Sequence, residues 1–157
     1  MVSGFNILFI AYEFPPLNSG GAYRPYFFSY YLKELHVNPV ILTLDPNDYC
    51  LVYDKYSVND DYLNVLNEKQ FSIHYFQSKN IKPSSRGKIN AFLKTYFNIY
   101  RGSEYWGLKN HKALLEHTIT KYKPKAVYIT VPPFSMLKLI PEIKKKYKLP
   151  VITDRKS

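Results

Sequence analysis

Residues 5–25 read FNILFIAYEFPPLNSGGAYRP, an apolar stretch that runs into two prolines and then a pair of glycines. Phe5 to Ala11 has the length of a strand and does not alternate between apolar and polar residues, which is typical of a parallel strand covered on both faces. The two prolines end that strand. Gly20 and Gly21 carry no Cβ, so an anion can approach their backbone N–H groups where we expect a helix to begin. The stretch therefore predicts an α/β fold with an anion-binding loop.

The alternation of strand and helix continues along the chain. We expect further strands at 39–44, 71–76, 126–131 and 150–154, and helices at 23–35, 88–100, 103–122 and from the turn at 132–135 to about 148. In the first helix, the spacing of Phe28, Tyr31, Leu32 and Leu35 predicts the buried face, with Pro25 in the first turn. Pro141 should bend or split the last helix. This order predicts a Rossmann-like parallel sheet flanked by helices in a single domain.

Length and composition restrict the class of protein. The 157 residues, 46% of them hydrophobic, suffice for one globular core, and a net charge of +10 favours anionic partners such as nucleic acid, acidic lipid or phosphorylated small molecules. The single cysteine, Cys50, excludes an internal disulfide framework and fits a reducing compartment. The first apolar run is too short for a secretory signal, and no segment reaches the roughly 20 apolar residues that span a bilayer. We therefore expect a cytoplasmic protein, soluble or peripheral to a membrane.

Several familiar motifs are missing from the sequence. No G-x-G-x-x-G follows the first strand, and no Asp-x-Asp occurs. His111 and His117 are six residues apart, which is roughly 240° around a helix, so they cannot bind one metal from one face. No Ser/His/Asp or Cys/His set is evident. We therefore expect neither a metal nor a cofactor, and the sequence assigns no catalytic residue.

Two loops and one strand end carry the candidate site residues. Arg24 lies one helical turn from Gly20 and Gly21 and can pair with a phosphate or carboxylate of a ligand, the alternative being a structural ion pair. Pro132, Pro133, Phe134 and Ser135 follow the strand at 126–131, and Ser135 can cap the next helix and expose its amides. Asp154 ends the last strand. The carboxyl ends of parallel strands form the binding crevice in such folds, so we expect these residues near one cleft.

Basic residues also gather away from these loops. Residues 78–103 contain no acidic residue, and basic side chains flank the predicted aromatic helix at 88–100, as at a membrane surface or a single-stranded nucleic acid site. The alternative is that this helix packs on the sheet and its charges are solvated. The lysine run at 144–146, followed by Lys148, is a weaker signal, because cations are favoured at a helix C-terminus in any case.

Four blocks together resemble the N-terminal domain of retaining glycosyltransferases of the two-domain GT-B type, family 4. They are ILFIAYEFPP at 7–16, GGAYRP at 20–25, YITVPPFS at 128–135 and LPVITD at 149–154. The resemblance implies that residues 1–157 form the acceptor-side Rossmann-like domain, with Gly20 and Gly21 facing the cleft near the donor diphosphate and the acceptor. The family's motif Asp-x-Arg-Asp is matched only by Asp154, since the chain continues Arg-Lys-Ser.

The family's nucleotide-sugar site lies in a second, C-terminal domain, which these residues do not include, so we expect the domain to be inactive alone. The function implied is transfer of a sugar, with retention, from a nucleotide-sugar donor to a polysaccharide, lipopolysaccharide or lipid-linked acceptor at the inner membrane face. Peripheral contact with an anionic membrane is expected, and specific nucleic-acid binding is not. The alternative is a basic α/β module that binds nucleic acid or membrane without catalysis.

Overall fold

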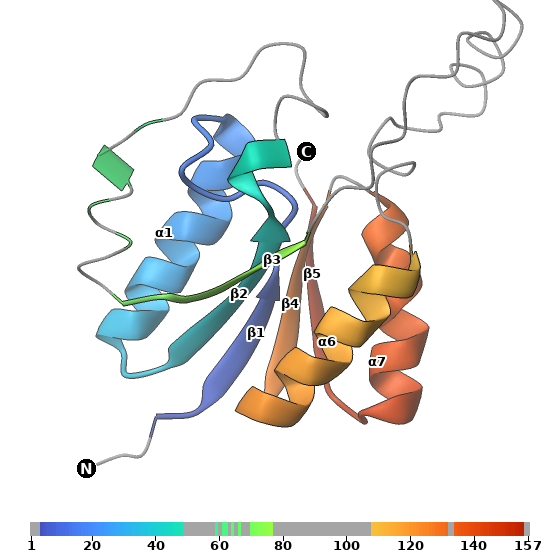
Figure 1. Ribbon diagram of the computed structural model, residues 1–157. Helices are drawn as coiled ribbons and strands as arrows, with labels where there is room; N and C mark the ends of the chain where they lie inside the picture. The colour runs from blue at the N-terminus through green and yellow to red at the C-terminus, as the bar shows by residue number, and fades with distance from the viewer. Residues whose placement is uncertain are drawn as a thin grey trace, which may run out of the picture.

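The fold is described here from a computed structural model, for residues 4–48, 59, 61, 62, 64, 66, 70–76, 108–131 and 134–155. A parallel sheet forms its centre, in the strand order β3-β2-β1-β4-β5 (Figure 1). The strands are β1 (Asn6–Ile10), β2 (Asn38–Leu44), β3 (Ser72–Phe76), β4 (Ala126–Val131) and β5 (Val151–Arg155). The predicted Rossmann-like α/β fold is therefore confirmed. Strand order reverses direction at β1, which places the switch point of the sheet between β1 and β4.

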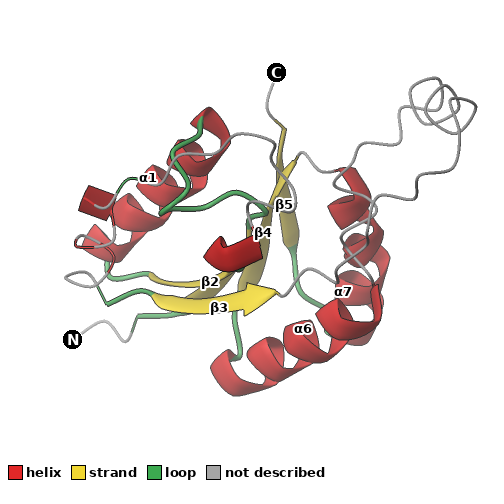
Figure 2. Ribbon diagram, turned by 45° about the horizontal axis from the view of Figure 1, so that its top comes forward, coloured by secondary structure: helices red, strands yellow, loops and turns green. Residues whose placement is uncertain are grey.

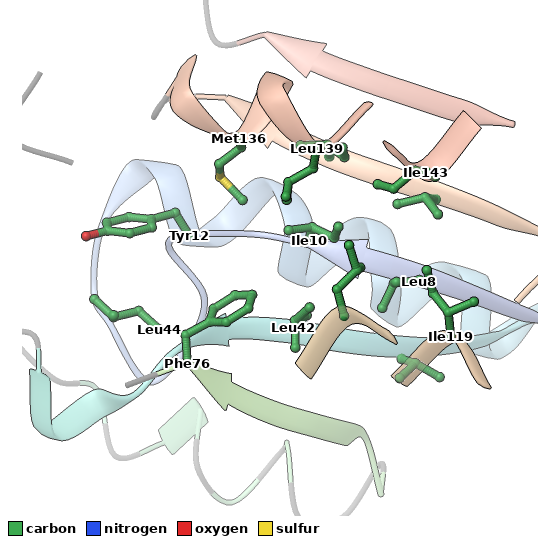
Figure 3. Packing of buried hydrophobic residues seen from close by; sticks show 14 of the residues in the cluster. Leu8, Ile10, Tyr12, Leu42, Leu44, Phe76, Ile119, Met136, Leu139 and Ile143 are labelled. Atoms are coloured by element: carbon green, nitrogen blue, oxygen red, sulfur yellow. The ribbon is translucent and has the colours of Figure 1, made fainter. Parts of the chain in front are cut away.

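Helices cover both faces of the sheet. Helix α1 (Gly20–Glu34) lies on one face, and α6 (Leu108–Tyr122) and α7 (Ile140–Lys146) lie on the other (Figures 1 and 2). Successive residues of a strand point to opposite faces, so β1 contributes to two cores. Leu8 and Ile10 pack in the cluster under α6 and α7 (Figure 3), while Phe9 packs in the cluster under α1. The first strand is thus buried on both faces over Leu8 to Ile10, as its apolar run predicted.

Helix α1 differs from the prediction in its start and its orientation. It begins at Gly20 rather than Tyr23, so Pro25 lies in the second turn instead of the first. The buried side chains are Ala22, Pro25, Tyr26 and Ser29. The residues predicted to be buried are turned outward: Phe28, Tyr31 and Leu35 are 44%, 61% and 71% exposed, and Leu32 is half-buried. The aromatic residue that this helix buries is Tyr26, whose ring packs against Phe14 and Tyr62, and the small side chains of Ala22 and Ser29 lie on the same face.

The segment before β5 is split, as Pro141 predicted. A 3₁₀ helix, η2 (Phe134–Leu139), is followed by α7, in which Pro141 occupies the first turn, where its missing N–H disrupts no helical bond. Ser135 does not cap α7, because Leu139 stands at the cap position and makes no side-chain cap bond. The 3₁₀ turns move the start of the α-helix past the predicted capping residue.

Some predictions fall outside the described residues. These are the helix at 88–100, residues 103–107 of the helix predicted at 103–122, and Pro132 and Pro133. A second 3₁₀ helix, η1 (Pro46–Asp48), follows β2. Within the described ranges, no helix combines the length and the apolar character that crossing a bilayer requires.

Candidate functional site

A pocket opens at the carboxyl edge of the sheet, at the switch point between β1 and β4. It is lined by Glu13, Gly20, Gly21, Arg24, Pro25, Thr130, Val131 and Asp154. The start of α1 forms one wall, and the ends of β4 and β5 form the other. The structure therefore brings together four of the predicted site residues, Gly20, Gly21, Arg24 and Asp154. Of the predicted second loop, Pro132 and Pro133 lie outside the described residues, and the backbone of Phe134 and Ser135 forms the start of η2.

The N-terminus of α1 already faces a carboxyl group of the chain itself. Ser19 caps the helix: its Oγ accepts a hydrogen bond from the Ala22 N–H at 3.1 Å and donates one to Glu13 Oε2 at 2.6 Å. A Cβ on Gly21 would lie only 2.0 Å from Glu13 Oε2, so the glycine leaves the space that this carboxyl group fills. A negative group at this position is stabilised by the helix dipole. The place predicted for a ligand anion is thus occupied, at least in part, by Glu13.

Asp154 is held by hydrogen bonds from two elements. Its Oδ1 accepts from Arg24 Nη1 on α1 at 2.9 Å, and its Oδ2 accepts from the Tyr128 hydroxyl on β4 at 2.8 Å. Burial raises the pKa of Tyr128 well above its ordinary value of 10, and the hydrogen bond to Asp154 raises it further. Tyr128 therefore remains a proton donor at neutral pH. Arg24 therefore forms an ion pair within the chain, and its side chain is 53% exposed at the pocket.

Charged groups of both signs line the pocket. They are the carboxyl groups of Glu13 and Asp154 and the guanidinium of Arg24. Two carboxyl groups against one guanidinium favour a ligand rich in hydroxyl groups over a polyanion.

Two residues of this site were missed by sequence reasoning. Glu13 is a charged residue between the buried aromatic residues Tyr12 and Phe14. A lone charge just after a buried strand could have indicated that it belongs to the site. Tyr128 gave no signal, because only the pairing of β4 with β5 places its hydroxyl beside Asp154.

Metal binding has no geometric support in the described part of the chain. No group of three or more His, Cys, Asp or Glu side chains there could hold a metal ion. His111 is buried beside the ring of Phe76, with the ring centroids 4.8 Å apart, whereas His117 is exposed. No family model, no curated protein and no solved structure matches this chain.

Proposed function

We propose that the pocket binds a sugar of a glycosyl acceptor, and that residues 1–157 form the acceptor-side domain of a retaining GT-B-type glycosyltransferase. The donor would be a nucleotide sugar held by a second domain, and the acceptor a polysaccharide, lipopolysaccharide or lipid-linked glycan. All four sequence blocks that resemble this family contribute to the pocket lining. Glu13 comes from the block at 7–16, Gly20, Gly21 and Arg24 from 20–25, Thr130 and Val131 from 128–135, and Asp154 from 149–154. The location of the pocket at the switch point of an α/β sheet supports the same role.

The observation that carries the proposal is the pair of carboxyl groups at Glu13 and Asp154. A donor diphosphate in this pocket would bring negative charge next to both of them, with Arg24 as the compensating cation among the lining residues. Like charges at about 4 Å repel by roughly 1 to 4 kcal/mol, depending on exposure to solvent. Sugar hydroxyls instead donate hydrogen bonds to carboxyl oxygens. We therefore expect this domain by itself to bind the acceptor glycan more strongly than the nucleotide sugar.

Saturation-transfer NMR on the isolated protein tests this expectation. The protein is mixed in turn with a panel of neutral oligosaccharides and with UDP-glucose, and transfer to ligand protons is measured. At least one oligosaccharide should show saturation transfer from the protein and should not be chemically converted. UDP-glucose should show weaker saturation transfer. Asp154→Asn keeps the side-chain shape but removes a carboxyl group, so it should weaken glycan binding at least fivefold. Asp61→Asn makes the same chemical change at an exposed position outside the pocket lining and should leave binding unchanged.

Three results would contradict the proposal. The first is stronger transfer to UDP-glucose than to every oligosaccharide, and the second is a glycan signal that Asp154→Asn leaves intact. The third is tight RNA or DNA binding that weakens steeply with salt, which would favour the basic binding module instead.

A further inference from the structure

Exposed lysines gather at the amino edge of the sheet, opposite the pocket. They lie in the last turns of α6 and α7 and in the turns that lead from these helices into β4 and β5, at the bottom of Figure 1. The lysines are Lys121, Lys123, Lys125, Lys144, Lys145 and Lys148. Within the described residues, none of these six has an acidic side chain at ion-pair distance, whereas their neighbour Lys146 pairs with Glu116 at 2.7 Å. Within the described residues, the amino edge of the sheet is thus strongly positive.

The turns themselves hold basic residues in a conformation that favours glycine. His36, Lys123 and Lys148 follow α1, α6 and α7 and have φ angles of 61°, 46° and 53°. Glycine is the usual residue at this position after a helix. The helix dipole favours cations near these ends, but its effect is confined to the last turn. It therefore does not account for Lys125, which lies beyond the turn, directly before β4.

Backbone contacts place these turns side by side. The Lys125 N–H donates to the Asn6 carbonyl at 2.8 Å, and the Val127 N–H donates to the Pro150 carbonyl at 2.9 Å, so the entries of β1, β4 and β5 are adjacent. Neighbouring strands lie about 4.8 Å apart, which is less than the Debye length of about 8 Å at physiological salt. The lysines of adjacent turns therefore act on a partner as one charged surface.

Apolar side chains are exposed at the same edge. Phe5, directly before β1, is 45% exposed, and Leu35, directly after α1, is 71% exposed. The Asn38 N–H donates to the Phe5 carbonyl at 2.9 Å, and a Cβ on Gly4 would lie 2.3 Å from the His36 carbonyl oxygen, so these two turns are in contact. Tyr31, one turn back along α1, is 61% exposed. Lysines beside exposed Leu, Phe and Tyr side chains are typical of surfaces that enter the headgroup region of a bilayer.

We propose that this amino edge binds the surface of an anionic lipid bilayer. The lysines contact the headgroups, and Phe5 and Leu35 insert among them. The inference rests on the charge and exposure of this edge and is independent of the proposed function of the pocket. It has a geometric consequence: the seven residues of β2 extend about 23 Å, so the pocket lies about that far from the bilayer and faces away from it.

Vesicle flotation tests the proposal directly. The whole protein is mixed with vesicles of phosphatidylcholine alone or with 30% phosphatidylglycerol, and the bound fraction is measured. We expect binding only to the anionic vesicles. Each lysine near such a surface strengthens binding about fivefold, so Lys123→Gln combined with Lys148→Gln should weaken binding roughly 30-fold. Leu35→Gln should weaken binding without changing the net charge.

The control variant removes the same charge elsewhere. Lys112 and Lys138 lie near the starts of α6 and α7, away from the amino edge, and Lys112→Gln combined with Lys138→Gln should change binding less than threefold. Circular dichroism confirms that each variant is folded. Absence of binding to anionic vesicles would overturn the proposal, as would an equal loss in both double variants. It would also be overturned if poly(U) bound more tightly than the vesicles and depended on Lys123 and Lys148.

Discussion

The bond between Tyr128 and Asp154 gives the sharpest test of the site geometry. Tyr128→Phe removes the hydroxyl that donates to Asp154 at 2.8 Å but keeps the ring, which contacts Phe9 and Phe28 at centroid distances of 4.8 and 5.0 Å. A hydrogen bond to a charged group contributes about 1.5 to 3 kcal/mol. The Asp154 side chain is 23% exposed, so Tyr128→Phe should lower the free energy of unfolding by the smaller of these values, about 1.5 kcal/mol.

A double-mutant cycle separates this bond from other effects. Asp154→Ala removes the same bond and also the ion pair with the half-exposed Arg24, which contributes about 0.5 kcal/mol. This substitution should therefore lower the free energy of unfolding by about 2 kcal/mol. The coupling energy between the two substitutions should be about 1 to 1.5 kcal/mol. Urea unfolding followed by circular dichroism measures all four proteins. A coupling energy below about 0.3 kcal/mol would refute the placement of the Tyr128 hydroxyl on Asp154.

The raised pKa of Tyr128 predicts that the free energy of unfolding depends on pH in the alkaline range. Burial and the bond to Asp154 raise the pKa of Tyr128 in the folded protein above its ordinary value of 10. Above pH 10 the unfolded chain therefore releases a proton that the folded protein keeps, so the free energy of unfolding falls as pH rises. Tyr128→Phe should remove part of that fall between pH 9 and 11. An identical pH slope in the two proteins would contradict the shift.

Three further predictions concern stability. Burial, followed by Lys121 and His117, lowers the pKa of His74 below 6.5, so stability should decline as pH falls from 7.5 to 5.5, and His74→Gln should reduce that decline in urea midpoints. Lys148→Gly should raise the free energy of unfolding by about 0.5 to 1 kcal/mol in thermal unfolding, because glycine adopts the observed φ of 53° without strain, whereas Lys148→Ala should give no gain. Ser19→Ala should cost about 1 to 2 kcal/mol in urea unfolding, since it removes the cap of α1 and the bond to Glu13; a change below 0.5 kcal/mol would contradict this role.

The sequence predicted the sheet better than it predicted the packing of α1. The strand at 126–131 has the bounds of β4, because a run of apolar residues bounded by prolines and lysines has few other structures open to it. The exposed face of α1 was predicted to be buried because Phe28, Tyr31 and Leu35 make it more hydrophobic than a face of small residues. The buried ring is Tyr26, with Ala22, Pro25 and Ser29 beside it, and the sequence alone does not reveal which of the aromatic residues of this helix is buried.

The candidate site was predicted in part for a similar reason. Gly20, Gly21, Arg24 and Asp154 lie at element ends, and the rule that crevices form at the carboxyl edge of parallel strands brings them together. The charge balance of the pocket was not predictable from these residues. It depends on Glu13 turning back toward Ser19 and on Tyr128 reaching across to the next strand, and both are tertiary contacts.

Strand β5 is an edge strand of the described sheet, and edge strands can promote self-association of a protein. Such an edge carries backbone N–H and C=O groups that a strand of another molecule can join, and Ile152 adds a side chain that is 54% exposed. Charged side chains near a sheet margin oppose that addition, because docking would strip them of water. Asp154, fixed in place by Arg24 and Tyr128, is one such residue. We therefore expect the residue that helps to form the pocket also to limit self-association through the edge of the sheet.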